Sequence, residues 1–246
     1  MVLVHGAFHG AWCFERVVPL LERAGVEAIA VELPGHGSSP LPYGDLHDDA
    51  GTVHDVLDTI AGEAILIGHS YGGAVITEAG VHSHVRELVY LCAFTIDAEE
   101  SCNSVTVDFN ARFPADGRPN LADGMSVQSD GTATLSAMAI QECFYNDCDE
   151  ETVRWALRHV GAQSLTNLGQ SPTSVAWNDR PSTYVLCTQD MAIHPMLQSV
   201  FAERCTRRRE MQAGHSPFAS KPAELSELLI DLARYGQKRI DGRVTE

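Results

Sequence analysis

The chain has 246 residues, of which 44% are hydrophobic and 20% charged, a composition typical of a folded globular domain and not of a disordered chain. Its 17 basic and 33 acidic residues give a formal net charge of -16 at pH 7. A charge of that sign repels phosphate backbones and anionic lipid surfaces, so we expect neither nucleic acid nor a membrane as a partner.

Cysteine usage and the start of the chain bear on its location. The seven cysteines are an odd number without a C-x-x-C pair, which favours reduced thiols over a disulfide framework or a zinc site. No stretch approaches the ~18 consecutive apolar residues of a membrane-spanning helix. The opening residues 1–6 lack the basic and apolar regions of a secretory signal. The sequence therefore predicts a cytoplasmic protein, and no pattern in it specifies an oligomeric state.

Short apolar runs alternate with helical patterns along most of the chain. The runs typical of buried parallel strands are residues 2–4, 28–31, 64–67, 88–91 and 184–187, with a weaker strand at 208–212. The segments of helical length and spacing are 11–24, 45–61, 71–82 and one that begins at Pro222. This alternation predicts an α/β fold, in which helices cover both faces of a mostly parallel sheet.

The stretch 97–180 breaks this rhythm. It is rich in Asp, Asn, Ser, Pro and Gly and contains only isolated helical patterns, at 135–144 and 150–160. Loops of this length are uncommon unless they are functional, so we interpret the stretch as a cap inserted over the carboxyl edge of the sheet. The expected organisation is a core formed by 1–96 and 181–246, with a cap or lid at 97–180. A long surface excursion is the alternative.

The most informative motif is G-H-S-Y-G at residues 68–72, which fits the pattern G-x-S-x-G. It directly follows the expected strand 64–67 and runs directly into the expected helix 71–82, the context that a nucleophile elbow requires. A serine on such a turn faces substrate, and the amides at the helix N-terminus face developing negative charge. The motif predicts Ser70 as a catalytic nucleophile.

A serine hydroxyl needs a base to take its proton and an acid to orient that base. Three histidines follow the elbow at sufficient distance. His215 lies between the expected last strand and last helix, where a loop can bring it to Ser70. His159 lies in a helical pattern of the cap, and His194 follows the expected acid and is expected to line the pocket. We therefore predict His215 as the base.

The acid has two candidates. Asp190 ends the expected strand 184–187 and precedes His215 by one helix–strand unit, the order expected after a nucleophile elbow. Asp97 follows the expected strand 88–91 and is the other position from which a carboxylate could reach the histidine, although it also suits a helix cap. We favour Asp190.

An oxyanion hole requires two backbone donors, one after the nucleophile and one from the loop after an earlier strand. The amide of Tyr71 meets the first requirement, and the amide of Ala7 is the best placed for the second. Phe8 is expected to line the substrate pocket, together with His194 and Trp177. Aromatic and sulfur-containing side chains of the cap favour an apolar acyl or alcohol group: Phe109, Phe113, Met125, Met138, Phe144 and Trp177.

The chain implies no cofactor and no metal. The glycine-rich segment 35–40 lacks the third glycine of a dinucleotide loop, and no Walker lysine is present. The histidine pairs His82 with His84 and His5 with His9 lack further ligands at zinc spacing.

Together these motifs resemble the α/β-hydrolase superfamily. More narrowly, they resemble the branch with plant hydroxynitrile lyases, plant methyl-ester hydrolases of the salicylate-binding type and small bacterial esterases. The matching stretches are LVHGAFHGAW at 3–12, LPGHGS at 33–38, GHSYGG at 68–73, TQD at 188–190 and GHS at 214–216. The cap is similar only in position and length. The resemblance implies an α/β-hydrolase fold, a serine–histidine–acid triad and a small-molecule ester as substrate.

Two departures from this branch bear on the reaction. Its lyases carry a threonine where this chain has Gly6, and a lysine directly after the catalytic histidine, where this chain has Ser216. That lysine supplies positive charge for departing cyanide, which a serine cannot, so the resemblance favours ester hydrolysis over cyanohydrin cleavage. An arginine of the expected cap is the alternative source of this charge: Arg112, Arg118 or Arg154. Two alternatives stay open. One is action on another bond, such as a lactone, amide or carbon–carbon bond, and the other is a non-catalytic ligand-binding receptor.

Overall fold

The structure, a computed structural model, describes residues 1–113 and 116–241. Its centre is a six-stranded sheet whose neighbouring strands are all parallel. In spatial order the strands are β2 (Ile29–Val31), β1 (Val2–Val4), β3 (Ala64–His69), β4 (Val85–Leu91), β8 (Ser182–Cys187) and β9 (Arg207–Met211). The expectation of a parallel sheet is confirmed, and each expected strand differs from the observed one only at its ends.

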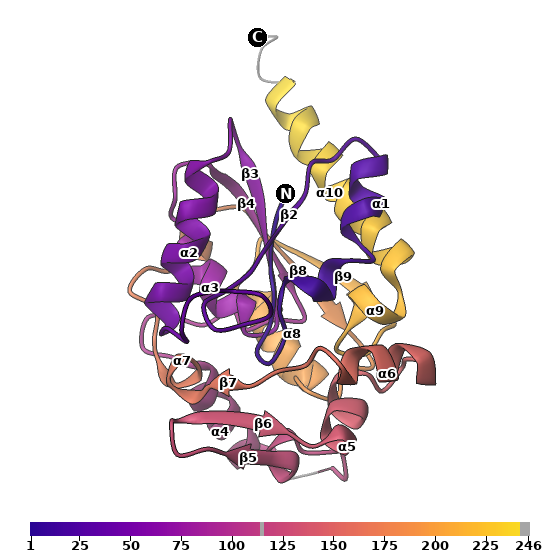
Figure 1. Ribbon diagram of the computed structural model, residues 1–246. Helices are drawn as coiled ribbons and strands as arrows, with labels where there is room; N and C mark the ends of the chain where they lie inside the picture. Colours follow the sequence, from indigo (N-terminus) through magenta and orange to yellow (C-terminus); the bar gives the residue numbers. More distant parts are fainter. Residues whose placement is uncertain (114–115, 242–246) are drawn as a thin grey trace.

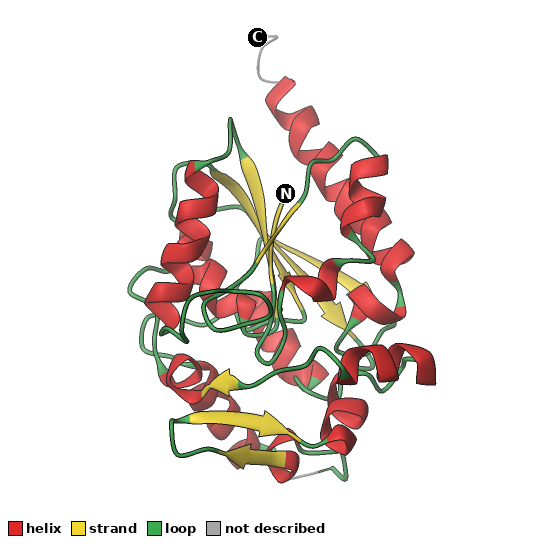
Figure 2. Cartoon of the chain, viewed as in Figure 1, coloured by secondary structure: helices red, strands yellow, loops and turns green. Residues whose placement is uncertain are grey.

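Helices cover both faces of this sheet (Figures 1 and 2). One face carries α2 (Leu46–Asp58), α3 (Gly72–Ala79) and α8 (Pro195–Glu203), and the other carries α1 (Val18–Arg23), α9 (Pro217–Ser220) and α10 (Pro222–Asp241). Side chains alternate between the two cores with the period of two that a strand imposes. In β4, Leu88 packs with the first set of helices and Val89 with the second. None of the described helices has the length and hydrophobicity needed to cross a membrane.

The first expected helix, 11–24, is wrong as a single element. The chain forms a 3-10 turn, η1 (Ala11–Phe14), and only later the short helix α1. Pro19 lies in the first turn of α1, where its missing amide hydrogen is tolerated. A helix running through from residue 11 would need that hydrogen, and it would force the residue before the proline into a disfavoured conformation.

The segment between β4 and β8 is more regular than expected. It contains a three-stranded antiparallel sheet of β5 (Met125–Val127), β6 (Thr132–Leu135) and β7 (Gln163–Ser164). Its helical elements are α4 (Cys102–Arg112), η2 (Leu121–Gly124), α5 (Ala137–Ala139), η3 (Ile140–Phe144), α6 (Glu150–Leu157), α7 (Leu165–Gly169) and η4 (Ala176–Asn178). The expected helix 150–160 is confirmed as α6, but 135–144 begins in strand β6. Residues 114–115 and 242–246 of the expected ranges lie outside the described residues.

The segment between β4 and β8 forms hydrogen bonds with the loops that follow three strands of the central sheet. Arg118 Nη1 donates to the carbonyl of Asp190 at 2.8 Å, after β8. The Gly214 amide, after β9, donates to Asp147 Oδ2 at 2.7 Å, and the Gly161 amide donates to the carbonyl of Phe8, after β1, at 2.9 Å. Because these loops follow the carboxyl ends of parallel strands, the segment lies over the edge of the sheet where α/β proteins bind ligands. Its separation as a distinct domain stays a prediction.

Candidate active site

Ser70 occupies a sharp turn between β3 and α3. Its φ angle is 53°, a left-handed conformation that is unfavourable for a residue with a side chain. Backbone hydrogen bonds hold it there: its amide donates to Leu91 at 3.3 Å and its carbonyl accepts from Phe94 at 3.1 Å. A Cβ on Gly72 would lie 2.5 Å from the carbonyl oxygen of Val4, so only glycine allows this close approach of α3 to β1. The Ser70 hydroxyl has no hydrogen-bond partner among the described residues, and the side chain is nearly buried.

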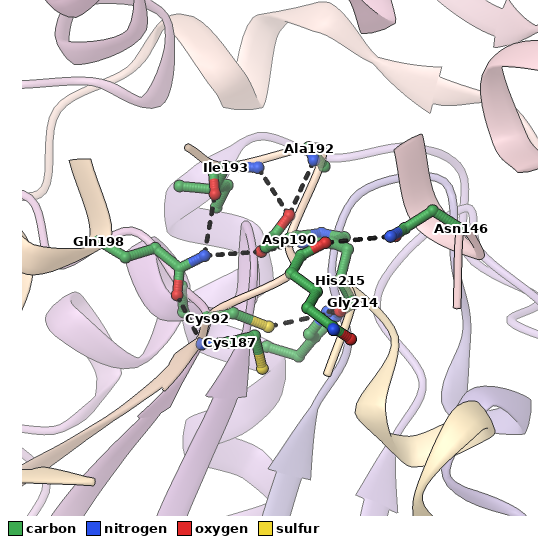
Figure 3. A network of polar contacts seen from close by, with 12 residues as sticks. Cys92, Asn146, Cys187, Asp190, Ala192, Ile193, Gln198, Gly214 and His215 are labelled. Carbon is green, nitrogen blue, oxygen red and sulfur yellow. Dashed lines mark hydrogen bonds and ion pairs between the residues drawn. The ribbon is translucent and has the colours of Figure 1, made fainter. Parts of the chain in front are cut away.

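His215 and Asp190 form a buried pair at the ends of β9 and β8 (Figure 3). The Nδ1 atom of His215 lies 2.8 Å from Oδ2 of Asp190, and neither side chain is exposed. A carboxylate only accepts, so the hydrogen of a neutral ring is on Nδ1 and the lone pair is on Nε2. This is the tautomer that a general base needs.

Asp190 accepts four hydrogen bonds, which satisfy and orient its buried carboxyl group. Oδ1 accepts from the amides of Ala192 at 2.7 Å and Ile193 at 2.9 Å. Oδ2 accepts from Gln198 Nε2 at 2.8 Å as well as from His215. Sequence reasoning missed Gln198, a fully buried residue of α8. No local pattern distinguishes a glutamine that turns inward from one that faces solvent.

The backbone of His215 lies against the residue that precedes the serine. Nε2 of His69 donates to the His215 carbonyl at 2.8 Å, and the thiol of Cys92 donates to the same oxygen at 3.3 Å. Burial lowers the pKa of His69 well below its usual value, so this ring is neutral. The His215 ring stacks on Phe144 of the cap, with centroids 5.3 Å apart. These contacts bring the loop after β9 beside the elbow.

Two backbone amides beside the elbow lack an acceptor. Within the described part of the chain, the amides of Ala7 and Tyr71 donate to no protein atom. Ala7 lies in the loop after β1, and the neighbouring Gly6 packs directly on Ser70. Two such unsatisfied donors are what an oxyanion hole requires; the roles of Ala7 and Tyr71 in one stay predictions.

The side chain of Tyr71 ends in a buried polar cluster. Its hydroxyl donates to Oδ2 of Asp49 in α2 at 2.6 Å, and Nδ2 of Asn167 in α7 donates to the same oxygen at 2.6 Å. Burial raises the pKa of Asp49 to about 6. Oδ1 of Asp49 and Oδ1 of Asn167 are both buried, and neither has a hydrogen-bond partner among the described residues. The cluster connects the core and the cap to the residue that follows Ser70.

The residues predicted to bind substrate have mixed placements. Phe8 is buried beside the Phe144 ring, with ring centroids 6.2 Å apart. His194 caps α8, because its Nδ1 accepts from the amide of Met196 at 3.0 Å. The Trp177 indole donates to the carbonyl of Ile96 at 3.0 Å, and the residue lies on η4, which packs against α3. Roles of Phe8, His194 and Trp177 in binding stay predictions.

The alternative acid and base lie elsewhere. Asp97 is exposed, and its Oδ1 accepts from the amide of Ala98 at 2.7 Å, a local turn contact. His159 packs against Trp12 and its Nδ1 lies 2.8 Å from the carbonyl of Trp155. Neither residue contacts Ser70 among the contacts of the described chain.

One group of possible metal ligands lies close together among the described residues: His69, Cys92 and His215, whose ligand atoms are within 4.8 Å of one another. Each already has a hydrogen-bond role in the site. Burial raises the pKa of Cys92 well above its usual value, which disfavours the thiolate that a metal requires. The absence of a metal and of a cofactor stays a prediction.

A sequence model of the Alpha/beta hydrolase family matches residues 1–228. An alpha/beta hydrolase of Aspergillus novofumigatus is 27% identical over 238 residues, which cover 90% of this chain and 91% of that protein. Methylesterase 9 of Arabidopsis thaliana is 27% identical over 248 residues, covering 94% of this chain and 97% of that protein. A solved pyrethroid hydrolase from Sphingobium faniae gives a TM-score of 0.81 at 25% identity, covering 95% of this chain and 96% of that one.

Proposed function

Because the chain belongs to the alpha/beta hydrolase family, we propose that it hydrolyses a small, apolar carboxylic ester through an acyl intermediate on Ser70. Two of the similar proteins are a methylesterase and a pyrethroid hydrolase, and these names support hydrolysis of an ester here. The aromatic rings of Phe8 and Phe144 beside the site support an apolar substrate. The cysteine pattern supports a cytoplasmic location.

In the acylation step, Ser70 Oγ attacks the ester carbonyl while Nε2 of His215 takes the hydroxyl proton. Asp190 stabilises the imidazolium through the bond to Nδ1. The carbonyl oxygen becomes an oxyanion that accepts from the amides of Ala7 and Tyr71. His215 then gives its proton to the departing alkoxide, so an alcohol leaves and the acyl group stays on Ser70.

In the second step a water molecule replaces the alcohol. His215 removes a proton from the water as it attacks the acyl carbon, and the same two amides stabilise the second oxyanion. The proton returns to Ser70, and the carboxylic acid is released. This chain supplies every group that both steps need, so the mechanism requires no cofactor.

The observations that carry the proposal are the buried His215–Asp190 pair at the ends of two strands and the strained turn at Ser70. Binding a ligand without turnover does not require an acid that orients a histidine, whereas a serine hydrolase does. We also propose that residues 97–180 act as a cap over a core of 1–96 and 181–246, since the Phe144 ring covers the His215 ring.

Cyanohydrin cleavage is the second reaction that this serine and histidine could perform. It needs a fixed positive charge beside His215, where the chain has the neutral Ser216. Lys221 is one of the two lysines of the chain, and its Nζ forms an ion pair with Oε2 of Glu224 in α10 at 3.5 Å. The neutral residue directly after the histidine thus favours hydrolysis.

The test measures release of p-nitrophenol from short-chain esters and of cyanide from mandelonitrile by the same preparation, with Ser70→Ala as control. We expect ester turnover that Ser70→Ala lowers by at least ~10⁴-fold, and cyanide release at the uncatalysed rate. Cyanide release without ester turnover would indicate a lyase. Binding of apolar esters without turnover would indicate a receptor.

A further inference from the structure

The residue after Ala7 is held in place by the cap. Phe8 has a φ angle of 63°, which a residue with a side chain keeps only where its surroundings enforce it. The Phe8 amide donates to Oε1 of Gln163 at 3.1 Å, and its carbonyl accepts from the amide of Gly161 at 2.9 Å. Both backbone groups of this strained residue are therefore bound by one short stretch of the cap. Gln163 in that stretch is 155 positions away from Phe8 along the chain.

The orientation of the Gln163 amide follows from its neighbours. The Phe8 N–H can only donate, so it faces the side-chain oxygen, whereas the Ser164 carbonyl can only accept and lies 3.0 Å from Nε2. Nε2 of His36 also lies 2.9 Å from Oε1. Gln163 is fully buried, so without its oxygen the Phe8 amide would lose its acceptor in a buried environment.

His9 holds the other end of the same peptide group. Its Nδ1 lies 2.8 Å from the Ala7 carbonyl, and its Nε2 lies 2.9 Å from the Tyr145 hydroxyl. Burial lowers the pKa of His9 to about 3, so the ring is neutral; Nδ1–H donates to the carbonyl and Nε2 accepts from the hydroxyl. The Ala7–Phe8 peptide plane is thus fixed through its carbonyl by His9 and through its amide by Gln163. Fixing this plane restricts the direction of the adjacent Ala7 N–H.

We propose that Gln163 is a positioning residue for the oxyanion hole, whose side-chain oxygen holds the Phe8 amide and thereby aims the Ala7 amide at the oxyanion. This inference rests on the proposed function. Gln163 acts through the Phe8 peptide and not on substrate. The cap then takes part in the catalytic geometry as well as covering the site.

Three variants separate this role from a merely structural one. Gln163→Met keeps the length of the side chain but removes the acceptor. Gln163→Glu keeps an oxygen acceptor for the Phe8 amide, and in its protonated form its hydroxyl donates to the Ser164 carbonyl in place of Nε2. The matched control is Tyr43→Phe. The Tyr43 hydroxyl donates to the carbonyl of Ala162 at 2.9 Å, so its loss removes a cap–core hydrogen bond one residue away that does not reach the Phe8 loop.

The measurements are kcat and KM for a p-nitrophenyl ester, the inhibition constant of a trifluoromethyl ketone, and the unfolding temperature. The ketone forms a hemiketal on Ser70 whose oxyanion occupies the same hole. We expect Gln163→Met to lower kcat and the affinity for the ketone by the same ~10- to 100-fold, with KM within about threefold of the wild type. The reason is that a displaced Ala7 amide loses a hydrogen bond that forms mainly in the transition state. Gln163→Glu should keep at least about a third of kcat, and Tyr43→Phe should stay within about twofold.

Several results would overturn the inference: a folded Gln163→Met that keeps more than half of kcat, an equal loss in Tyr43→Phe, or a loss confined to KM. If Gln163→Met does not fold, Gln163→Glu is compared with Gln163→Asn, whose amide is one methylene too short. Equal kcat in these two would count against the role. A wild-type protein without ester turnover would instead refute the proposed function itself, so the two failures are distinguishable.

Discussion

The imidazole of His215 and the carboxylate of Asp190 meet at 2.8 Å in a site where neither side chain is exposed. The carboxylate is held by two backbone amides and Gln198, so its position does not depend on the histidine. The pair is therefore organised before any substrate binds. Preorganised charge of this kind acts on the transition state without reorganisation during the reaction.

The acid is tested by Asp190→Asn, which places an amide beside Nδ1 of His215. We expect a loss of about 10⁴-fold in kcat, because the neutral ring would lose the tautomer that leaves Nε2 free. The matched control Asp97→Asn should keep kcat within about twofold, since Asp97 is exposed and bonds only within its own turn. Ester kinetics measure both variants. A larger loss of kcat in Asp97→Asn than in Asp190→Asn would assign the acid to Asp97, in the loop after β4.

Gly6 packs directly against Ser70, the proposed nucleophile. A Cβ at this position would lie 2.8 Å from Cβ of Ser70 and 2.9 Å from Nδ1 of His69, closer than real contacts allow. Gly6→Ala should therefore displace Ser70 or the oxyanion loop and lower kcat by ~10-fold or more, in line with the sensitivity of catalysis to ~1 Å misplacement. Gly51→Ala in α2, where a Cβ meets nothing within 4 Å, is the control. Its activity should be unchanged, and an unaffected Gly6→Ala would contradict the geometry.

Asp49 should make the folded state more stable at mildly acid pH. Burial raises its pKa from 3.8 to about 6, so the folded protein binds the proton more tightly than the unfolded chain. Between these values the folded state gains stability as pH falls, by about 1 kcal/mol from pH 7.5 to pH 5. Asp49→Asn removes this contribution. Urea unfolding at pH 7.5 and pH 5 should show that the free energy of unfolding of the wild type rises, relative to that of the variant, as the pH falls. An equal pH dependence of the two proteins would refute the raised pKa of Asp49.

Buried histidines act in the opposite direction. Burial lowers the pKa of His9 to about 3 and holds the pKa values of His5 and His69 well below 6.5. Below pH ~6.5 these histidines become protonated in the unfolded chain but stay neutral in the folded protein. The free energy of unfolding therefore falls on acidification, on the order of 1–2 kcal/mol per histidine at pH 5. The net effect should be a fall in unfolding temperature from pH 7.5 to pH 5. His9→Gln should make this fall smaller, and an unfolding temperature that does not fall would be inconsistent with neutral buried rings.

Local patterns explain why much of this molecule could be predicted from its sequence. Aliphatic runs such as 64–67 predict buried strands because they are too short for a helix and are bounded by glycine and polar residues. The order of Ser70, Asp190 and His215 along the chain places each at the end of a parallel strand, and the structure brings Asp190 and His215 into contact. Their catalytic roles remain predictions.

The contacts that depend on tertiary packing could not be predicted. Gln163, Asn167 and Gln198 are polar residues whose burial depends on which way the chain folds back, and polarity alone predicts an exposed side chain. The hairpin of β5 and β6 was missed because its strands are short and have no continuous apolar face. Helix α4 was missed for a related reason, since only Cys102 and Phe109 of its residues are buried.

The proposed nucleophile can be tested most directly by titrating the protein with a p-nitrophenyl phosphonate ester and mapping the adduct by peptide mass spectrometry. A serine esterase of this mechanism should release one equivalent of p-nitrophenol per chain, carry the phosphonyl group on Ser70, and lose ester hydrolysis in proportion to labelling. A protein that keeps its ester turnover after Ser70 is fully modified, or that is inactivated by labelling at another residue while Ser70 stays free, would contradict the assignment of Ser70 as the nucleophile.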